Sequence, residues 1–425
     1  MREYARAEEY REEESSMNEE TIQSTETELV RPKLNIKDLL LSLAAVLLSA
    51  CILSGAIPSA FAGLVGAALV VYAIIAVRNV GAVIQLLLTA IIVTVLTFLP
   101  VCGAAALALM IGTGVLAWLF MILPKYKWAP IGLLLVAYGL GFLVTSDFVT
   151  PLLSLTFLPA AALMAWAHAR DLGRTATVLH AFLGFLLAVL ATLCVLLYRT
   201  YGSINYDVLM TFVNELKQTF VTIGIEAGKM LWESVETTVT QAALPAESIE
   251  KLRETYAQAF GESNLRVTAD ILMGLVPALV GVPALIVSYL SNVVLLRKYY
   301  NTEWRRYMTP AACTLDISPA AAVIYVICMV LVIFINKQSL FLMAVTNMFL
   351  LLLPALSLTG VNVVLYNVKH AKGGLGKASL LLLVAAVCCM GVNSLYFLAL
   401  WGAYVIVSSA LHQKIIQKMK DQNGK

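Results

Sequence analysis

The chain has 425 residues, of which 60% are hydrophobic and only 13% are charged. A soluble globular domain carries about 25% charged residues, so this composition excludes a protein built around a large water-soluble core. The formal net charge is only +3, and the sequence lacks a basic-aromatic recognition module, so nucleic acid is excluded as an expected partner.

The charged residues are segregated from the apolar ones. All 26 acidic residues lie outside the long apolar runs, as do nearly all of the 29 lysines and arginines. An unpaired charge in hydrocarbon is costly, so a bilayer imposes this distribution on a chain that crosses it repeatedly. We therefore predict an all-α, polytopic integral membrane protein with about 12 transmembrane helices and the lipid bilayer as its first partner.

The chain begins with a polar, acidic segment. Residues 1–36 contain no apolar stretch, which predicts a disordered cytoplasmic tail rather than a cleaved signal peptide. A membrane domain over residues 37–199 follows, since a span needs roughly 20 apolar residues, or fewer in a locally thin bilayer. Its seven predicted spans are Leu39–Ile57, Phe61–Val77, Gly81–Leu99, Val101–Leu123, Ile131–Thr145, Leu152–Ala167 and Thr177–Tyr198.

Residues 200–269 form a net acidic insert between apolar runs. Apolar residues recur every three or four positions from Val208 to Val239, which predicts an amphipathic helix. Gly224 and Gly228 weaken this helix and suggest a bend, and Pro245 suits the start of a second, short helix. Three interpretations stay open: a hairpin packed on its own membrane domain, a lid over an outward-facing cavity, or an arm that binds a partner.

A second membrane domain is predicted over residues 270–411, followed by a basic cytoplasmic tail over 412–425. One helix from Leu380 to Leu411 would be about 48 Å long, against a hydrocarbon core of roughly 30 Å. We therefore predict two short spans there, with a turn at residues 391–394. The five spans of this domain are Ile271–Leu296, Ala320–Ile335, Leu340–Leu365, Leu380–Met390 and Leu395–Ser409.

The basic residues of the short loops predict the orientation. With a cytoplasmic amino terminus, the inner loops and the tail hold most lysines and arginines, whereas the outer short loops hold only Lys337, with Arg199 beside the insert. This asymmetry predicts a cell-membrane protein with both termini in the cytoplasm and residues 200–269 extracytoplasmic. The basic residues of the inner loops are Arg78, Lys125, Lys127, Arg170, Arg174, Arg297, Lys298, Arg305, Arg306, Lys369, Lys372 and Lys377.

Catalytic and metal-binding patterns are missing from the sequence. It contains no HExxH, phosphate-binding loop or GxSxG motif, and its seven cysteines show no metal-ligand spacing. His180 is the one histidine inside a predicted span, where a hydrogen-bonded helix position is favoured over a proton relay. We therefore expect a protein that is not an enzyme and that holds no cofactor or metal.

The spans contain amides and prolines that suggest a ligand site. Such residues mark broken helices, whose free backbone groups need a protein or wet environment and often line binding sites. The competing interpretation is structural, because amides also join helices and proline kinks are common in proteins that bind nothing. The candidate ligand-binding residues are Gln85, Asn292, Asn347, Asn362, Pro277 and Pro354.

The carboxyl-terminal third resembles a known family. Ser291-Asn292 precedes Arg297-Lys298, a loop carries Trp304-Arg305-Arg306 and residues 316–319 (Asp-Ile-Ser-Pro), and the tenth span runs from Asn347 through Pro354 to Gly360. This pattern resembles the YybS-like family of predicted multi-pass bacterial membrane proteins, over about residues 39 to 411. The resemblance implies a bacterial cell-membrane protein similar in style to the substrate-binding subunits of energy-coupling-factor transporters, although those have about half as many spans.

The sequence thus favours a membrane protein of transport type. It would bind a small solute at midplane. The chain has no nucleotide-binding motif of its own, so two interpretations stay open: uncoupled passage, or coupling through a partner membrane or motor protein. The alternative is a non-transporting envelope scaffold or regulator that acts through the acidic tail and the outer insert. An intramembrane enzyme is a third possibility.

Overall fold

The computed structural model describes residues 36–77, 80–97, 99–123, 128–241, 245–300, 315, 317–335, 339–370 and 393–423. Within these ranges the regular structure is entirely helical and contains no strand, which confirms the predicted all-α class. The chain divides into two compact units, residues 1–41 and 42–425. The predicted acidic tail lies outside the described residues, and the packing below concerns residues 42–425.

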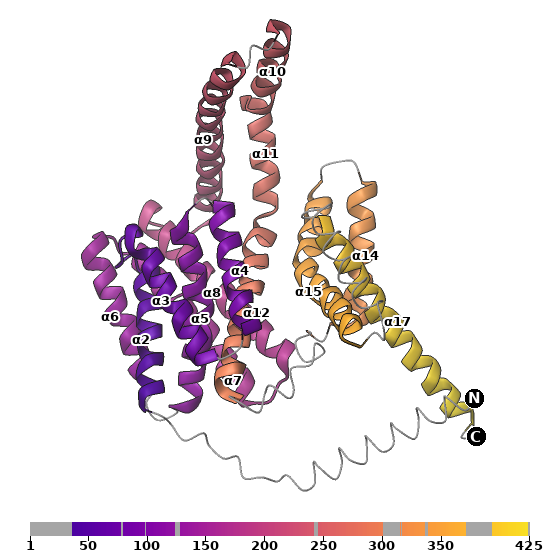
Figure 1. The fold of residues 1–425 in the computed structure, drawn as a ribbon. Helices are drawn as coiled ribbons and strands as arrows, with labels where there is room; N and C mark the ends of the chain where they lie inside the picture. Colours follow the sequence, from indigo (N-terminus) through magenta and orange to yellow (C-terminus); the bar gives the residue numbers. More distant parts are fainter. Residues whose placement is uncertain are drawn as a thin grey trace. The chain divides into compact units, whose positions relative to one another are not determined.

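The first seven predicted spans coincide with helices (Figure 1). The sixth comprises a short 3-10 helix, η1, that leads into α7. Helix α5 is central, because it packs against α3, α4, α7 and α12 and is the most buried of the long apolar helices. The bounds are α2 Ile36–Leu53, α3 Ser59–Val77, α4 Val80–Thr97, α5 Pro100–Ile122, α6 Trp128–Thr145, η1 Thr150–Leu155, α7 Phe157–Ala169 and α8 Arg174–Tyr201.

The insert folds into three helices, α9 Tyr206–Gln241, α10 Ala246–Ala259 and α11 Glu262–Gly274, which we call the arm. Helix α9 packs against both of the others. It continues as one helix through Gly224 and Gly228, where the sequence suggested a bend. A Cβ atom at Gly228 would lie 2.6 Å from the Cβ atom of Phe260, and one at Gly224 would lie 2.9 Å from Leu265. These glycines therefore let α9 approach the other two helices closely.

Four described helices follow the arm: α12 Val276–Tyr300, α14 Pro319–Phe334, α15 Leu340–His370 and α17 Asn393–Asn423. The predicted span from Ile271 is interrupted, since α11 ends at Gly274 and α12 begins at Val276. Helix α17 continues to Asn423, so most of the predicted basic tail is helical. The predicted span Leu380–Met390 lies outside the described residues.

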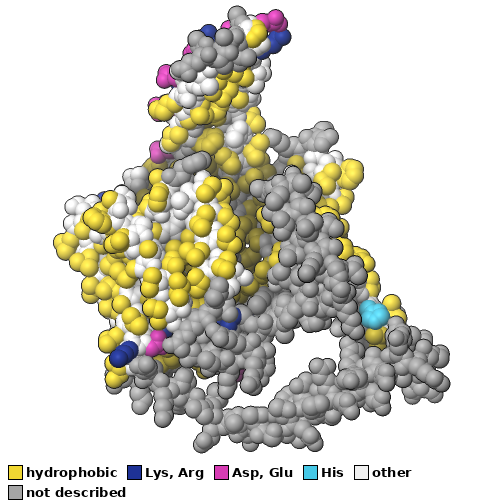
Figure 2. All heavy atoms as spheres, viewed as in Figure 1, with side chains coloured by type: hydrophobic (Ala, Val, Ile, Leu, Met, Phe, Trp, Pro, Cys, Tyr) yellow, Lys and Arg dark blue, Asp and Glu magenta, His cyan; other side chains and the backbone are white. Residues whose placement is uncertain are grey.

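The described part of the chain has nine helical segments long and apolar enough to cross a membrane, and two shorter apolar helices, Gly81–Thr97 and Pro319–Phe334. Many large apolar side chains on these helices face outward, among them Leu64, Leu96, Leu143 and Phe334. Hydrophobic side chains dominate the face of the helices in Figure 2, and acidic side chains gather on the arm. Soluble monomers rarely expose so much apolar surface, so this is a multi-pass membrane protein.

Candidate functional site

The six ligand-binding candidates from the sequence do not form one site. Gln85 is exposed on α4, and Pro277 is exposed in the first turn of α12, where no interior hydrogen bond is lost. Pro277 and Asn292 are 15 residues apart on α12, about 22 Å along the axis, and Asn347 and Asn362 are equally far apart on α15. A single small solute cannot contact both Pro277 and Asn292, or both Asn347 and Asn362.

Asn347 joins helices. Its Oδ1 accepts a hydrogen bond from the backbone N–H of Ala278 at 2.9 Å, and its Nδ2 donates to the carbonyls of Gly274 at 2.7 Å and Met343 at 2.9 Å. Gly274 and Ala278 flank the break between α11 and α12, where backbone groups lose their helical partners. The amide of Asn347 therefore pairs backbone groups that the break sets free.

Pro354 and Asn362 lie within α15, which runs unbroken past both of them. Asn362 is buried, and its Nδ2 has no hydrogen-bond partner within the described structure. The neighbouring contact between α15 and α17 is very close: a Cβ atom at Gly402 would lie 2.2 Å from the carbonyl oxygen of Leu356. Ser357 also donates a hydrogen bond to the Leu395 carbonyl at 2.9 Å. This part of α15 is a tight helix contact.

Asn292 belongs to a different group, a seam of buried polar side chains around α5. It comprises Ser49 on α2, Thr113 on α5, and Ser291 and Asn292 on α12, all 4% exposed or less. Within the described residues, the hydroxyls of the first three and Oδ1 of Asn292 have no hydrogen-bond partner. A buried polar atom left unpaired costs about 1–3 kcal/mol, so this polar seam is energetically unusual.

Two glycines of α5 bring the three helices of the polar seam together. A Cβ atom at Gly112 would lie 2.9 Å from the Cβ atom of Ser49, and one at Gly114 would lie 2.5 Å from the carbonyl oxygen of Ser291. Thr113 stands between these two contacts, about 20 Å along the axis from Pro100 and about 14 Å from Ile122. The polar seam thus lies near the middle of α5, away from both helix ends.

Basic residues are buried at the end of α12 next to the polar seam. The sequence placed Arg297 and Lys298 in a loop, but both lie in the last turn of α12, at 3% and 8% exposure. Nζ of Lys298 lies 4.4 Å from the ring centre of Trp118 and 5.6 Å from that of Tyr72, which are favourable cation–π distances. We call these four residues the basic end.

An ion pair connects the α6–η1 loop with the end of α8. Arg199 donates a hydrogen bond to Asp147, whose other carboxylate oxygen accepts from the backbone and the hydroxyl of Thr150 at 3.0 and 2.8 Å. The Arg199 guanidinium and the Thr150 donors hold the pKa of the Asp147 carboxyl well below its usual value. Nearby, Tyr201 donates to Glu215 at 2.6 Å, which links α8 to α9.

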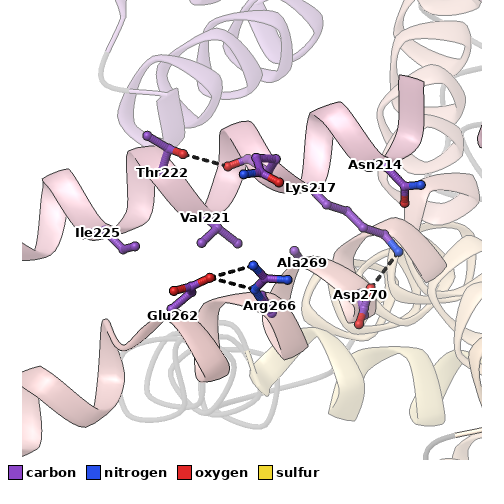
Figure 3. A pocket seen from close by; sticks show the side chains of 10 residues that line it. Asn214, Lys217, Val221, Thr222, Ile225, Glu262, Arg266, Ala269 and Asp270 are labelled. Carbon is purple, nitrogen blue, oxygen red and sulfur yellow. Dashed lines mark hydrogen bonds and ion pairs between the residues drawn. The ribbon is translucent and has the colours of Figure 1, made fainter. Parts of the chain in front are cut away.

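The arm contains a cleft of about 500 Å³ between α9 and α11 (Figure 3). Lys217 of α9 pairs with Asp270 of α11 at 2.7 Å, and Arg266 pairs with Glu262, both on α11, at 2.6 Å. The remaining lining is polar near the rim and apolar at Val221 and Ala269, which are buried. The lining residues are Asn214, Lys217, Gln218, Val221, Thr222, Ile225, Glu262, Arg266, Ala269 and Asp270.

Sequence reasoning missed most of these residues, for physical reasons. Serine and threonine are common in membrane helices, so nothing in the pattern distinguishes Ser49, Thr113 and Ser291 until the helices pack around them. In the sequence the charges of the cleft contributed only to the net acidic character of the insert, although the four-residue spacing of Glu262, Arg266 and Asp270 was a usable signal. Among the residues described, no three His, Cys, Asp or Glu side chains are grouped to hold a metal ion.

Comparison with known proteins gives no relative. No family model, no curated protein and no solved structure matches the chain.

Proposed function

We propose that this multi-pass membrane protein is of transport type and binds a small polar solute within its helix bundle. The observation that supports this most is the polar seam, where Ser49, Thr113, Ser291 and Asn292 carry buried atoms that have no hydrogen-bond partner among the described residues. Native proteins pair nearly all buried polar groups, and a solute with hydroxyl or amide groups would pair those of the four that it reached. In this proposal Asn292 is the one sequence candidate that contacts the solute.

The supporting context is the helix arrangement around the polar seam. Its residues come from α2, α5 and α12, which are separate segments long and apolar enough to cross the bilayer. A site between helices that move relative to one another can open toward either side, as alternating access requires. The proposal includes the expected orientation, with both termini in the cytoplasm and the arm outside, and a partner motor protein. Membership of the YybS-like family and a bacterial origin remain hypotheses within it.

Native mass spectrometry of the full-length protein tests this proposal. We expect the detergent-purified protein to retain a small molecule, and we expect Thr113→Val and Asn292→Leu to reduce the bound fraction by tenfold or more. Asn362→Leu is the matched control, because it removes another buried asparagine with an unpaired atom, on α15. If the wild type carries no molecule, or if all three variants retain it equally, the polar seam is not a solute site.

One observation favours the alternative, an envelope scaffold that acts through the arm. Leu209, Leu216, Ile223 and Met230 are exposed on α9 at intervals of seven residues, with 38–69% of each side chain accessible. That spacing places them along one side of the helix, as in helices that associate through heptads. If Leu216→Ser with Ile223→Ser abolished the association of the protein with a membrane partner while solute retention was unchanged, the scaffold would be the better account.

A further inference from the structure

The cleft of the arm has the size and composition of a small-molecule site. Its volume of about 500 Å³ falls within the range of about 300–1,000 Å³ typical of ligand pockets. Its lining includes the buried apolar side chains of Val221 and Ala269 and the exposed polar side chains of Asn214, Gln218 and Thr222. A cleft of this kind offers both contact area and orienting hydrogen bonds.

The charges of the cleft balance. Two cations, Lys217 and Arg266, stand beside two anions, Glu262 and Asp270. An anionic ligand would be attracted by the two cations and repelled by the two anions, and a cationic ligand would experience the reverse. A zwitterion can place each of its charges beside the opposite one, so the charge pattern discriminates by ligand class.

The two ion pairs of the cleft leave some hydrogen-bond donors and acceptors of Arg266 and Asp270 available to a ligand. Nε and Nη2 of Arg266 both donate to one oxygen of Glu262, at 3.0 and 2.6 Å, so Nη1 lies outside this pair. Nζ of Lys217 lies 2.7 Å from Oδ1 of Asp270, and the Asp270 side chain is 61% exposed, so its carboxylate can accept further hydrogen bonds. Exposed pairs contribute about 0.2–1 kcal/mol, so shifting them toward a ligand costs little.

The spacing of Arg266 and Asp270 along α11 sets the length of the ligand. The two residues are one turn apart, so their backbone positions are about 6 Å apart along the helix axis. The termini of an extended dipeptide lie about 7 Å apart, at roughly 3.5 Å per residue. We propose that the cleft between α9 and α11 binds a small zwitterion of dipeptide length, with its carboxylate at Arg266 and its ammonium group at Asp270. The two side chains of the ligand would then lie over Val221 and Ala269.

Four forms of one peptide test the charge requirement directly. The probes are Ala-Ala, its N-acetyl form (anion only), its carboxyl amide (cation only) and the doubly blocked neutral form. Binding to the full-length, detergent-purified protein is measured by isothermal titration calorimetry. We expect Ala-Ala to bind at least tenfold more tightly than each blocked form. If the four forms bind equally, or if none binds, the proposal is wrong.

Variants locate the binding. Arg266→Gln and Asp270→Asn should each weaken Ala-Ala binding at least tenfold, and Gln218→Trp should block the cleft without changing a charge. The matched control is Lys251→Gln. It breaks the exposed ion pair between Lys251 and Glu247, which are four positions apart on α10 and lie outside the cleft. Unchanged helix content by circular dichroism shows that the arm is folded. If Lys251→Gln weakens binding as much as the cleft variants, the ligand binds elsewhere. Because Thr113 and Asn292 are not involved, this result is independent of the seam proposal.

Discussion

Replacing Asn347 with leucine should destabilise the protein, whereas the same change at Asn292 should not. Both asparagines are buried in apolar helices, at 9% and 4% exposure. Asn347 makes three hydrogen bonds, two of them to residues on either side of the α11–α12 break. Asn292 carries a buried Oδ1 without a partner in the described structure. The two variants therefore compare the loss of a paired amide with the loss of an unpaired one, with the same change in side-chain volume at both positions.

The magnitude follows from the bonds. In membrane proteins an interhelical hydrogen bond contributes about 0.6 kcal/mol on average and up to about 1.7. Asn347→Leu also leaves the backbone N–H of Ala278 unpaired, which costs about 1–3 kcal/mol for a buried group; Ala278 is only 2% exposed. We expect a loss of about 2–3 kcal/mol in the free energy of unfolding. Asn292→Leu should lie within about 0.5 kcal/mol of the wild type or be more stable.

The assay is equilibrium unfolding of the purified protein in mixed micelles with a denaturing detergent, followed by circular dichroism. Asn347→Asp is a useful third variant, because it keeps the acceptor for Ala278 and loses the two donated bonds. Equal destabilisation by Asn347→Leu and Asn292→Leu would refute this reasoning. It would show that burial of the side chain, and not the hydrogen bonds at the break, decides stability.

Three further predictions concern close contacts and one ion pair. Gly402→Val should lower the melting temperature strongly, because its side chain would collide with the Leu356 carbonyl, whereas Gly139→Ala, with open space around it, should not. Gly228→Leu should separate α9 from α10 at Phe260 and abolish dipeptide binding in the cleft, measured by calorimetry, while α12 and α15 keep their protease resistance. The lowered pKa of Asp147 means that its pair with Arg199 stabilises the fold fully above the unfolded pKa of about 3.9 and progressively less as pH falls below it. Asp147→Asn should therefore reduce the loss of stability on acidification below about pH 4, measured by thermal melts, and an unchanged acid profile would contradict this.

The helical class and most span positions could be predicted from the sequence because both depend on local properties. Hydropathy determines which segments enter the bilayer. Proline separates helices, as at Pro100, where α5 begins after α4 has ended at Thr97. Pro277 suggested a broken helix within the predicted span Ile271–Leu296, and the structure has its break two residues earlier, at Leu275. The break depends on Asn347, which lies some seventy positions further along the chain and pairs the freed backbone groups.

The candidate site was predictable only in part, because pairing is a property of the packed structure. Asn292 and Asn347 look alike in the sequence. Within the described residues Oδ1 of Asn292 on α12 has no hydrogen-bond partner, whereas Asn347 on α15 bonds to α11 and α12. Arg297 and Lys298 read as loop charges, but α12 extends by one turn and buries them against Trp118 and Tyr72. Gly228 read as a weak helix position until Phe260 was found against it.

The location of the arm relative to the carboxyl terminus tests the membrane arrangement most directly. Four described helices, α12, α14, α15 and α17, follow the arm, and the sequence predicts a fifth crossing at Leu380–Met390. Five crossings place the arm and the end of α17 on opposite sides, whereas four place them on the same side.

Two single cysteine variants, Lys251→Cys in the arm and Lys414→Cys in α17, can be labelled in intact cells with a membrane-impermeant maleimide. The wild type reports any background from the native cysteines. We predict that Lys251→Cys is labelled at once and that Lys414→Cys is labelled only after the cells are permeabilised. Labelling of both in intact cells, or of neither, would contradict twelve crossings with the arm outside.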